Sequence, residues 1–194
     1  MPRAIIVHGY ASGPRDAWLP WLEKELTTRG FLVHALEMPT PHEPRVSEWV
    51  ETLTRAVEAP DEHTYFIGHS LGCQAILRFL ETLSGRATVG GAVFVAGFLR
   101  PLEGVTKLTR PTRVPMEWVE NLPDSQLVRN VLGRSVAIFS DDDRTVPLEY
   151  AKAFEEELGS EVRIEHGKRH FHSKAGIFTL PSALEAILEI SGRG

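Results

Sequence analysis

The segment TYFIGHSLG, residues 64–72, carries the strongest indication of the fold. Its first four residues form a short apolar run typical of a buried strand, and an amphipathic helical pattern begins at Leu71. Between them, Gly68 and Gly72 flank Ser70 in a Gly-x-Ser-x-Gly pattern. Side chains at the two glycine positions would collide with neighbouring backbone in a tight strand-to-helix turn. The stretch therefore predicts a strand, a sharp turn with Ser70 at its tip, and a helix whose N-terminal amides face that serine.

The rest of the chain repeats this alternation of short apolar runs with longer amphipathic ones. The alternation is typical of an α/β fold with a mostly parallel sheet and helices on both faces. The six expected strands are residues 4–7, 31–36, 64–67, 91–96, 135–139 and 161–164. The expected helices are residues 18–28, 46–57, 71–83, 115–131 and 147–158, and a last one from Pro181. We expect a single domain over residues 1–194, with a short cap segment at residues 98–114.

The composition describes an ordinary globular protein, with 194 residues, 42% hydrophobic, 24% charged and a net charge of −5. Its basic residues are scattered, which argues against nucleic acid as a partner. The longest apolar runs are too short to span a membrane and no signal-peptide pattern is present, so we expect a cytoplasmic protein. Cys73 is the single cysteine and has no partner for an internal disulfide. The sequence indicates no cofactor and gives no support for a protein partner.

A serine hydroxyl is inert at neutral pH unless a base accepts its proton and an acid orients that base. We interpret Ser70 as a nucleophile and therefore expect an acid and then a histidine at the ends of later strands. Asp141, Asp142 and Asp143 follow the fifth expected strand. Asp143 lies four residues before the proline that begins the next helix, and we expect it to be the acid. The other two are expected in a solvated turn.

Three histidines, His166, His170 and His172, follow the sixth expected strand. Because His166 is still close to the strand end, we expect His170 to be the base, with His172 as the main alternative. The histidines could instead be metal ligands, since two of them are four residues apart. No glutamate lies between His166 and His170, as it would in the helical zinc-protease motif. Gly167, which comes soon after the strand, argues against a helix here. The sequence therefore favours no metal site.

A second turn of interest, His8-Gly9-Tyr10, follows the first strand. We expect the backbone N–H groups of Leu71 and Tyr10 to form an oxyanion hole, the alternative being a plain turn at the glycine. The residues expected to contact substrate are His8, Gly9, His69 and Trp118. For His69 and Trp118, the alternative interpretation is that the side chain packs in the core.

Further motifs extend over nearly the whole chain: residues 5–10, Trp18, Met38-Pro39-Thr40-Pro41, Trp49, Trp118, residues 143–147 and His170-Phe171. Together with the serine turn they resemble the small α/β-hydrolases of the retinoblastoma-binding-protein-nine-like family. The resemblance implies a compact α/β-hydrolase without the first strands of the larger enzymes, with Ser70, Asp143 and His170 matching the family's triad. Arg144 and Arg169 depart from the proline and glycine common there, so we expect the two loops to differ in conformation.

The sequence therefore predicts a serine hydrolase that cleaves small carboxylic esters through an acyl-enzyme intermediate. The same machinery would serve thioesters or amides, and the fold could also act as a non-catalytic protein-interaction module. Because residues 98–114 are few and charged, we expect no deep apolar tunnel and a preference for short acyl chains.

Overall fold

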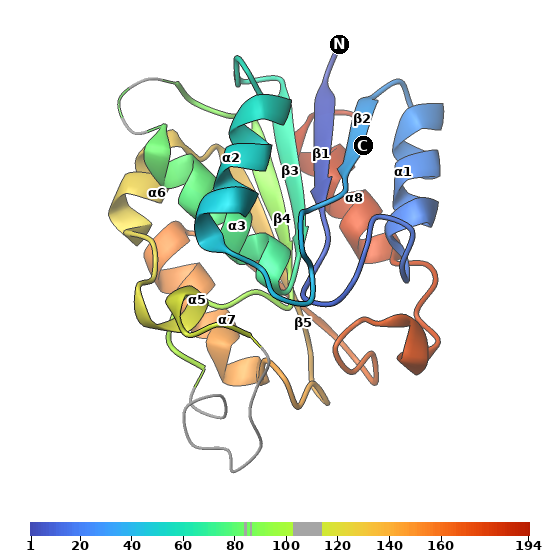
Figure 1. Cartoon of the computed structure of the whole chain (residues 1–194). Coiled ribbons are helices and arrows are strands. Elements are labelled where there is room, and N and C mark those ends of the chain that lie inside the picture. The colour runs from blue at the N-terminus through green and yellow to red at the C-terminus, as the bar shows by residue number, and fades with distance from the viewer. Residues whose placement is uncertain (84, 86, 103–113) are drawn as a thin grey trace.

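The computed structural model describes the chain except for residues 84, 86 and 103–113. At its centre lies one six-stranded sheet, in the order β2-β1-β3-β4-β5-β6 with every neighbouring pair parallel (Figure 1). The strands are β1 (Arg3–Val7), β2 (Leu32–Leu36), β3 (Thr64–His69), β4 (Gly91–Val95), β5 (Arg134–Ser140) and β6 (Glu161–Glu165). The predicted six-stranded parallel sheet is confirmed.

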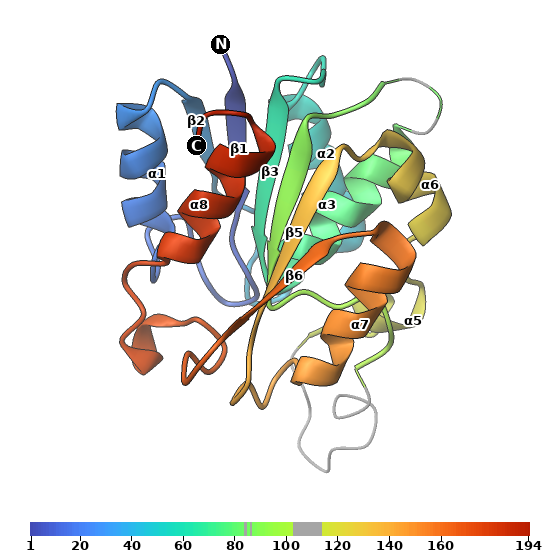
Figure 2. The same ribbon diagram turned by 180° about the vertical axis from the view of Figure 1, so that it is seen from behind.

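Helices cover both faces of this sheet (Figures 1 and 2). On one face lie α2 (Val46–Ala56), α3 (Leu71–Thr82), α6 (Ser125–Val131) and α7 (Ala151–Ala153), and on the other lie α1 (Leu19–Thr28) and α8 (Pro181–Ile190). Successive side chains of a strand point to opposite faces. In β1, Ile5 therefore packs into the first hydrophobic cluster and Ile6 into the second. The inner strands are therefore buried on both faces, which explains why their sequences are continuous apolar runs.

The single helix predicted over residues 115–131 is wrong. The structure has a short helix, α5 (Glu117–Glu120), and then α6 after a break. Pro123 lies in this break and has no N–H to donate to the preceding turn. The Asp124 side chain accepts hydrogen bonds from the N–H groups of Gln126 and Leu127, which caps a new helix start.

The helix expected over residues 147–158 is present as three joined turns of different pitch. They are the 3₁₀ turn η1 (Leu148–Tyr150), then α7, then the π turn η2 (Phe154–Leu158), which Gly159 ends at φ +69°. A further 3₁₀ turn, η3 (Ser173–Ala175), follows β6. Most of the expected cap segment, residues 103–113, lies outside the described residues. No helix among those described is long and apolar enough to cross a membrane.

The strand order changes direction between β1 and β3. From β1 the chain adds β2 on one side, and β3 then starts the growth of the sheet on the other. In open parallel sheets this switch point leaves a crevice at the carboxyl ends of the strands. These ends lie at the bottom of Figure 1, whereas both chain termini lie toward the top. The crevice is the place where the loops after β1, β3, β5 and β6 meet.

Candidate active site

Ser70 stands at the tip of the turn between β3 and α3, with φ +52° and ψ −115°. A non-glycine residue in this region is strained, so the surrounding structure must hold it there. The Ser70 N–H donates to the carbonyl of Val95 at 2.9 Å. A Cβ on Gly68 would lie 2.8 Å from the Cys73 nitrogen, and one on Gly72 would overlap the Val7 carbonyl oxygen. Close backbone contacts therefore require both glycines, and the turn that they form holds the serine in a half-buried position.

Three side chains from three loops form one line of hydrogen bonds at this tip. The Ser70 Oγ lies 2.8 Å from the Nε2 of His170, whose Nδ1 lies 2.7 Å from Oδ2 of Asp143. The other carboxylate oxygen of Asp143 accepts the N–H groups of Thr145 at 2.7 Å and Val146 at 3.1 Å. Since a carboxylate only accepts, Nδ1 carries the imidazole proton and Nε2 is left to accept the serine hydroxyl.

The two aspartates expected in a solvated turn are exposed, but they do more than face water. Oδ2 of Asp141 lies 2.6 Å from Nδ1 of His166, and Oδ1 of Asp142 accepts the N–H of Arg169 at 2.7 Å. The hydrogen bond from His166 lowers the pKa of Asp141. Both carboxylates therefore fasten the loop that carries His170. A run of acids directly after a strand was the available signal for this role.

His69 packs directly beneath His170. Its Nε2 lies 2.9 Å from the His170 carbonyl oxygen, so this nitrogen carries the proton and donates. The indole of Trp18 meets the His69 ring edge-on, with centroids 6.0 Å apart. Burial is the main cause that lowers the pKa of His69 to about 3, and the charge of the nearby His170 acts in the same direction. His69 is thus a neutral donor at every ordinary pH, and it fixes the backbone of His170.

The turn after β1 lies against the serine. A Cβ on Gly9 would lie 3.3 Å from the Ser70 Cβ and 3.2 Å from the His69 carbonyl oxygen, so a side chain here would push the two turns slightly apart. Leu71 is the first residue of α3, and Tyr10 follows Gly9. Within the described part of the chain, neither the Leu71 N–H nor the Tyr10 N–H donates a hydrogen bond. Two free amides therefore border Ser70.

Two residues predicted to contact substrate belong to the core instead. His8 is 1% exposed, its Nε2 accepts the Met38 N–H at 3.0 Å and its Nδ1 lies 2.8 Å from the Gly9 carbonyl oxygen. Trp118 is fully buried, and its Nε1 donates to the Pro44 carbonyl at 2.9 Å. Both rings have their polar atoms satisfied inside the protein, and neither reaches a cavity at the site.

The three histidines after β6 have separate partners. His166 pairs with Asp141, His170 bonds Ser70 and Asp143, and Nδ1 of His172 accepts the Ala175 N–H at 3.0 Å at the start of η3. His170, and not the alternative His172, therefore reaches the serine. Among the described residues no group of three or more His, Cys, Asp or Glu side chains is arranged to hold a metal ion.

A cavity of about 520 Å³, which we call the serine cavity, opens at Ser70. Its apolar wall consists of Leu19, Leu71, Phe98, Leu102, Val114 and Val146. Its polar end consists of Ser12, Asp16, Ser173 and Lys174. The rest of the lining consists of Gly9, Tyr10, Ala11, Ala17, His69, Thr145, His170 and His172.

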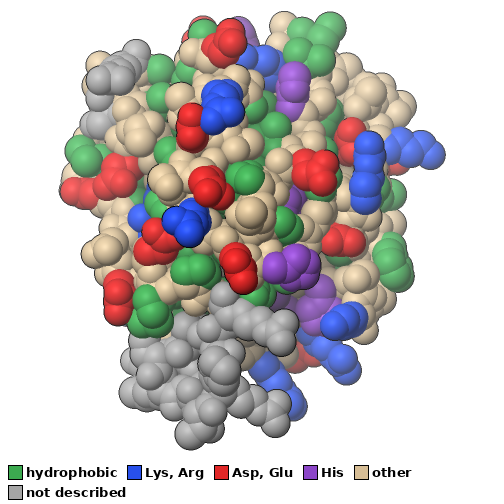
Figure 3. Space-filling view, in the orientation of Figure 1, with side chains coloured by type: hydrophobic (Ala, Val, Ile, Leu, Met, Phe, Trp, Pro, Cys, Tyr) green, Lys and Arg blue, Asp and Glu red, His purple; other side chains and the backbone are tan. Residues whose placement is uncertain are grey.

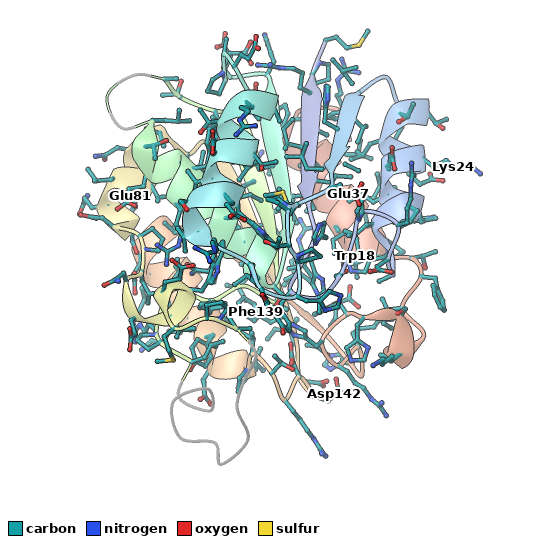
Figure 4. The ribbon with its side chains drawn as sticks, viewed as in Figure 1. Trp18, Lys24, Glu37, Glu81, Phe139 and Asp142 are labelled. Atoms are coloured by element: carbon teal, nitrogen blue, oxygen red, sulfur yellow. The ribbon has the colours of Figure 1, made fainter. Side chains whose placement is uncertain are left out.

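A second cavity of about 430 Å³, which we call the arginine cavity, adjoins the first. Its lining consists of Asp142, Asp143, Arg144, Thr145, Arg169, His170 and His172. Thr145, His170 and His172 line both cavities, which therefore meet at the His170 ring. Asp142 marks this region at the lower edge of the molecule in Figure 4.

Comparison with known proteins agrees with this geometry, since residues 4–189 match the family described as serine hydrolase. The chain belongs to the serine hydrolase family. This serine hydrolase is 33% identical to YdeN of Bacillus subtilis, which is named as a hydrolase, over 186 aligned residues. The aligned region covers 95% of this chain and 94% of YdeN. The solved structure of the ydeN gene product has a TM-score of 0.89 at 31% identity and covers 99% of this chain and 100% of that one.

A further curated relative and a further solved structure extend the comparison. Serine hydrolase RBBP9 of Rattus norvegicus is 36% identical over 83 residues, 41% of this chain and 44% of its own, which confirms the resemblance found in the sequence. The esterase domain of a Rhodothermus marinus protein has a TM-score of 0.71 at 17% identity, covering 97% of this chain and 86% of that one. At that identity the likeness shows the fold alone. The predicted α/β-hydrolase fold is confirmed.

Proposed function

We propose that this serine hydrolase cleaves small carboxylic esters through an acyl-enzyme on Ser70. The observation that carries the proposal is the unbroken line of hydrogen bonds from Ser70 through His170 to Asp143. Ser70 Oγ attacks the ester carbonyl carbon while its proton passes to Nε2 of His170. The carbonyl oxygen, now negative, accepts the free N–H groups of Leu71 and Tyr10.

The tetrahedral intermediate then collapses. Nε2 of His170 gives its proton to the alcohol oxygen as the carbon–oxygen bond of the ester breaks, leaving the acyl group on Ser70. A water molecule repeats the two steps, with His170 again taking and returning the proton, and releases the acid. Asp143 keeps the imidazole in the tautomer that can accept from serine and stabilises the positive ring during each transfer. The amides of Thr145 and Val146 hold that carboxylate in place.

The size of the substrate follows from the serine cavity. About 520 Å³ lies within the range of small-molecule sites, and the apolar wall suits an acyl chain. Oxygen esters are easier to cleave at such a site than amides, because the alcohol is a better leaving group than an amine. An esterase domain among the proteins of the same fold supports this choice.

The test is labelling by a fluorophosphonate, which reacts with activated serines, followed by hydrolysis of matched ester, thioester and amide panels. We expect label on Ser70, hydrolysis of esters, and loss of both in Ser70→Ala to below about 1% of the wild-type rate. Ser47→Ala removes an exposed serine of α2 that lines neither cavity, so it is the matched control and should keep both. An interaction module would leave Ser70 unlabelled, and a thioesterase or amidase would favour the other panels. Any of these results would refute the proposal.

A further inference from the structure

The arginine cavity contains two cationic groups that the proposed reaction does not use. Arg144 comes from the loop after β5 and Arg169 from the loop after β6, and both line this cavity with the ring of His170. Among the described residues, neither guanidinium has an ion-pair or hydrogen-bond partner. Figure 3 shows Lys, Arg and His side chains gathered at the lower right of the molecule, below the carboxyl ends of the strands.

The backbone at Arg169 supports a use for its side chain. Arg169 has φ +49°, in the left-handed region where glycine is free of strain and a side chain is not. Its N–H donates to Asp142 at 2.7 Å, which holds the loop in this conformation. A strained residue that persists beside a reacting group points to a function for the side chain it carries.

The carboxylates in the same cavity already have donors. Asp143 accepts from Thr145, Val146 and His170, and Asp142 accepts from the Ser140 hydroxyl and the Arg169 N–H. Hydrogen bonds of this kind spread and stabilise the negative charge of a carboxylate. Among the described residues of this cavity, the two guanidiniums therefore supply the charged N–H donors that are still free for a ligand, beside the Nε2–H of His172, whose Nδ1 accepts the Ala175 N–H.

The position of the cavity decides which part of a substrate would enter it. Nε2 of His170 must face the alcohol oxygen that it protonates, so the alcohol portion leaves the serine along the His170 side. The arginine cavity begins on that side, at the ring shared by both cavities. A substrate group in the arginine cavity would be separated from the ester carbon by the His170 ring and its hydrogen bonds. An alcohol chain of several carbons is needed to span that separation.

We propose that Arg144 and Arg169 bind an anionic group, a carboxylate or a phosphate, at the far end of the substrate's alcohol portion. This inference rests on the proposed function and names its substrate class: esters of small acids with alcohols that carry a negative charge. Guanidiniums suit this task because their fork of N–H donors matches the oxygens of both groups.

The experiment compares butyrate esters that differ only at the alcohol end: the ester of 6-hydroxyhexanoate, the neutral ester of 6-hydroxyhexanamide, and the ester of 5-hydroxypentyl phosphate. We expect kcat/KM for one or both anionic esters to exceed that of the neutral ester by about tenfold. The better of the two identifies the anion. The preference should shrink as salt is raised, because the arginines are exposed.

Arg144→Gln and Arg169→Gln should each reduce this preference about threefold or more, and the double variant should abolish it. Lys168→Gln removes a neighbouring cation that lines neither cavity and should leave the preference intact. Arg169→Gly relieves the strained φ, so it should fold at least as stably as wild type and still lose preference. That variant separates loss of binding from loss of folding.

Equal rates for all three esters, or a preference that survives the double variant, would overturn the inference and leave the proposed function standing. Absence of both ester hydrolysis and Ser70 labelling would instead overturn the proposed function. If Ser70 is labelled but the esters are hydrolysed too slowly to measure, the readout becomes the protection of Ser70 from labelling. 6-Hydroxyhexanoate or 5-hydroxypentyl phosphate should then slow labelling more than 6-hydroxyhexanamide does in wild type and not in the double variant, and equal protection overturns the inference.

Discussion

The buried, neutral His69 makes the stability of this fold sensitive to acid. An unfolded imidazole has a pKa of about 6.5, whereas burial lowers the pKa of His69 to about 3. As the pH falls below 6.5, the imidazole of the unfolded chain therefore binds a proton, whereas the His69 ring of the folded chain stays neutral. The free energy of unfolding must fall with pH, and it continues to fall until the pH reaches the folded value near 3.

The size of this effect follows from linkage at about 1.4 kcal/mol per pH unit for one group. Between pH 7 and pH 5, His69 alone should lower the free energy of unfolding by about 2 kcal/mol. His8 adds to the loss in the same direction, because burial lowers its pKa as well. A loss of this size is a large fraction of the stability of a typical domain.

The matched variant is His69→Gln, whose amide can still donate to the His170 carbonyl but binds no proton. Urea unfolding followed by tryptophan fluorescence at pH 7, 6 and 5 gives the free energy of unfolding of both proteins. We expect the variant to lose about 2 kcal/mol less than wild type over this range. His63→Gln removes an exposed histidine and should behave as wild type. Parallel pH curves for wild type and His69→Gln would refute the account of a buried, uncharged donor.

The remaining predictions concern the reaction and the core. Asp143→Asn should lower kcat on a good ester a few thousandfold, because it favours the wrong imidazole tautomer, whereas Asp142→Asn should cost less than about tenfold; a larger loss in Asp142→Asn would contradict this. His170→Ala should remove turnover and His172→Ala should not, since only His170 reaches Ser70 Oγ; the reverse result would move the base. Trp118→Ala should lower the free energy of unfolding by about 3–5 kcal/mol in urea titrations, because the ring is fully buried. Among p-nitrophenyl esters, acetate to butyrate should have the highest kcat/KM, and a maximum at ten carbons or more would show that a long apolar channel exists.

The sequence was sufficient for the sheet and for the serine turn, because both leave local signals. Continuous apolar runs predict strands buried on two faces, and the spacing of Gly68, Ser70 and Gly72 predicts a turn that only glycine can flank. Trp118 was misplaced because a tryptophan in an amphipathic pattern fits a cavity wall and a core equally well. Tertiary contacts decided between them, because Trp118 packs against Trp49 and donates to the Pro44 carbonyl, and both partners lie far away in the sequence.

The loops after β5 and β6 were only partly predictable for a related reason. The order of nucleophile, acid and histidine follows from chemistry, but the choice among adjacent aspartates and nearby histidines depends on where each loop turns. Asp143 was found through its distance from the next helix. The hydrogen bonds of Asp141 and Asp142 join residues far apart in the chain, so the run of acids after the strand indicates the loop but not the partner that each carboxylate takes.

The three consecutive carboxylates after β5 also limit how this protein can vary over evolutionary time. Each of them holds a different point of the loop after β6, at His166, Arg169 and His170. Deleting or inserting one residue within this run would place each carboxylate against the hydrogen-bond partner of its neighbour, so that His170 would no longer face the carboxylate of Asp143. We therefore expect the length of this run to be held constant in variants that keep the activity. Loop-grafting designs on this scaffold should keep that spacing, together with Arg144 and the two amides of Thr145 and Val146 that hold Asp143.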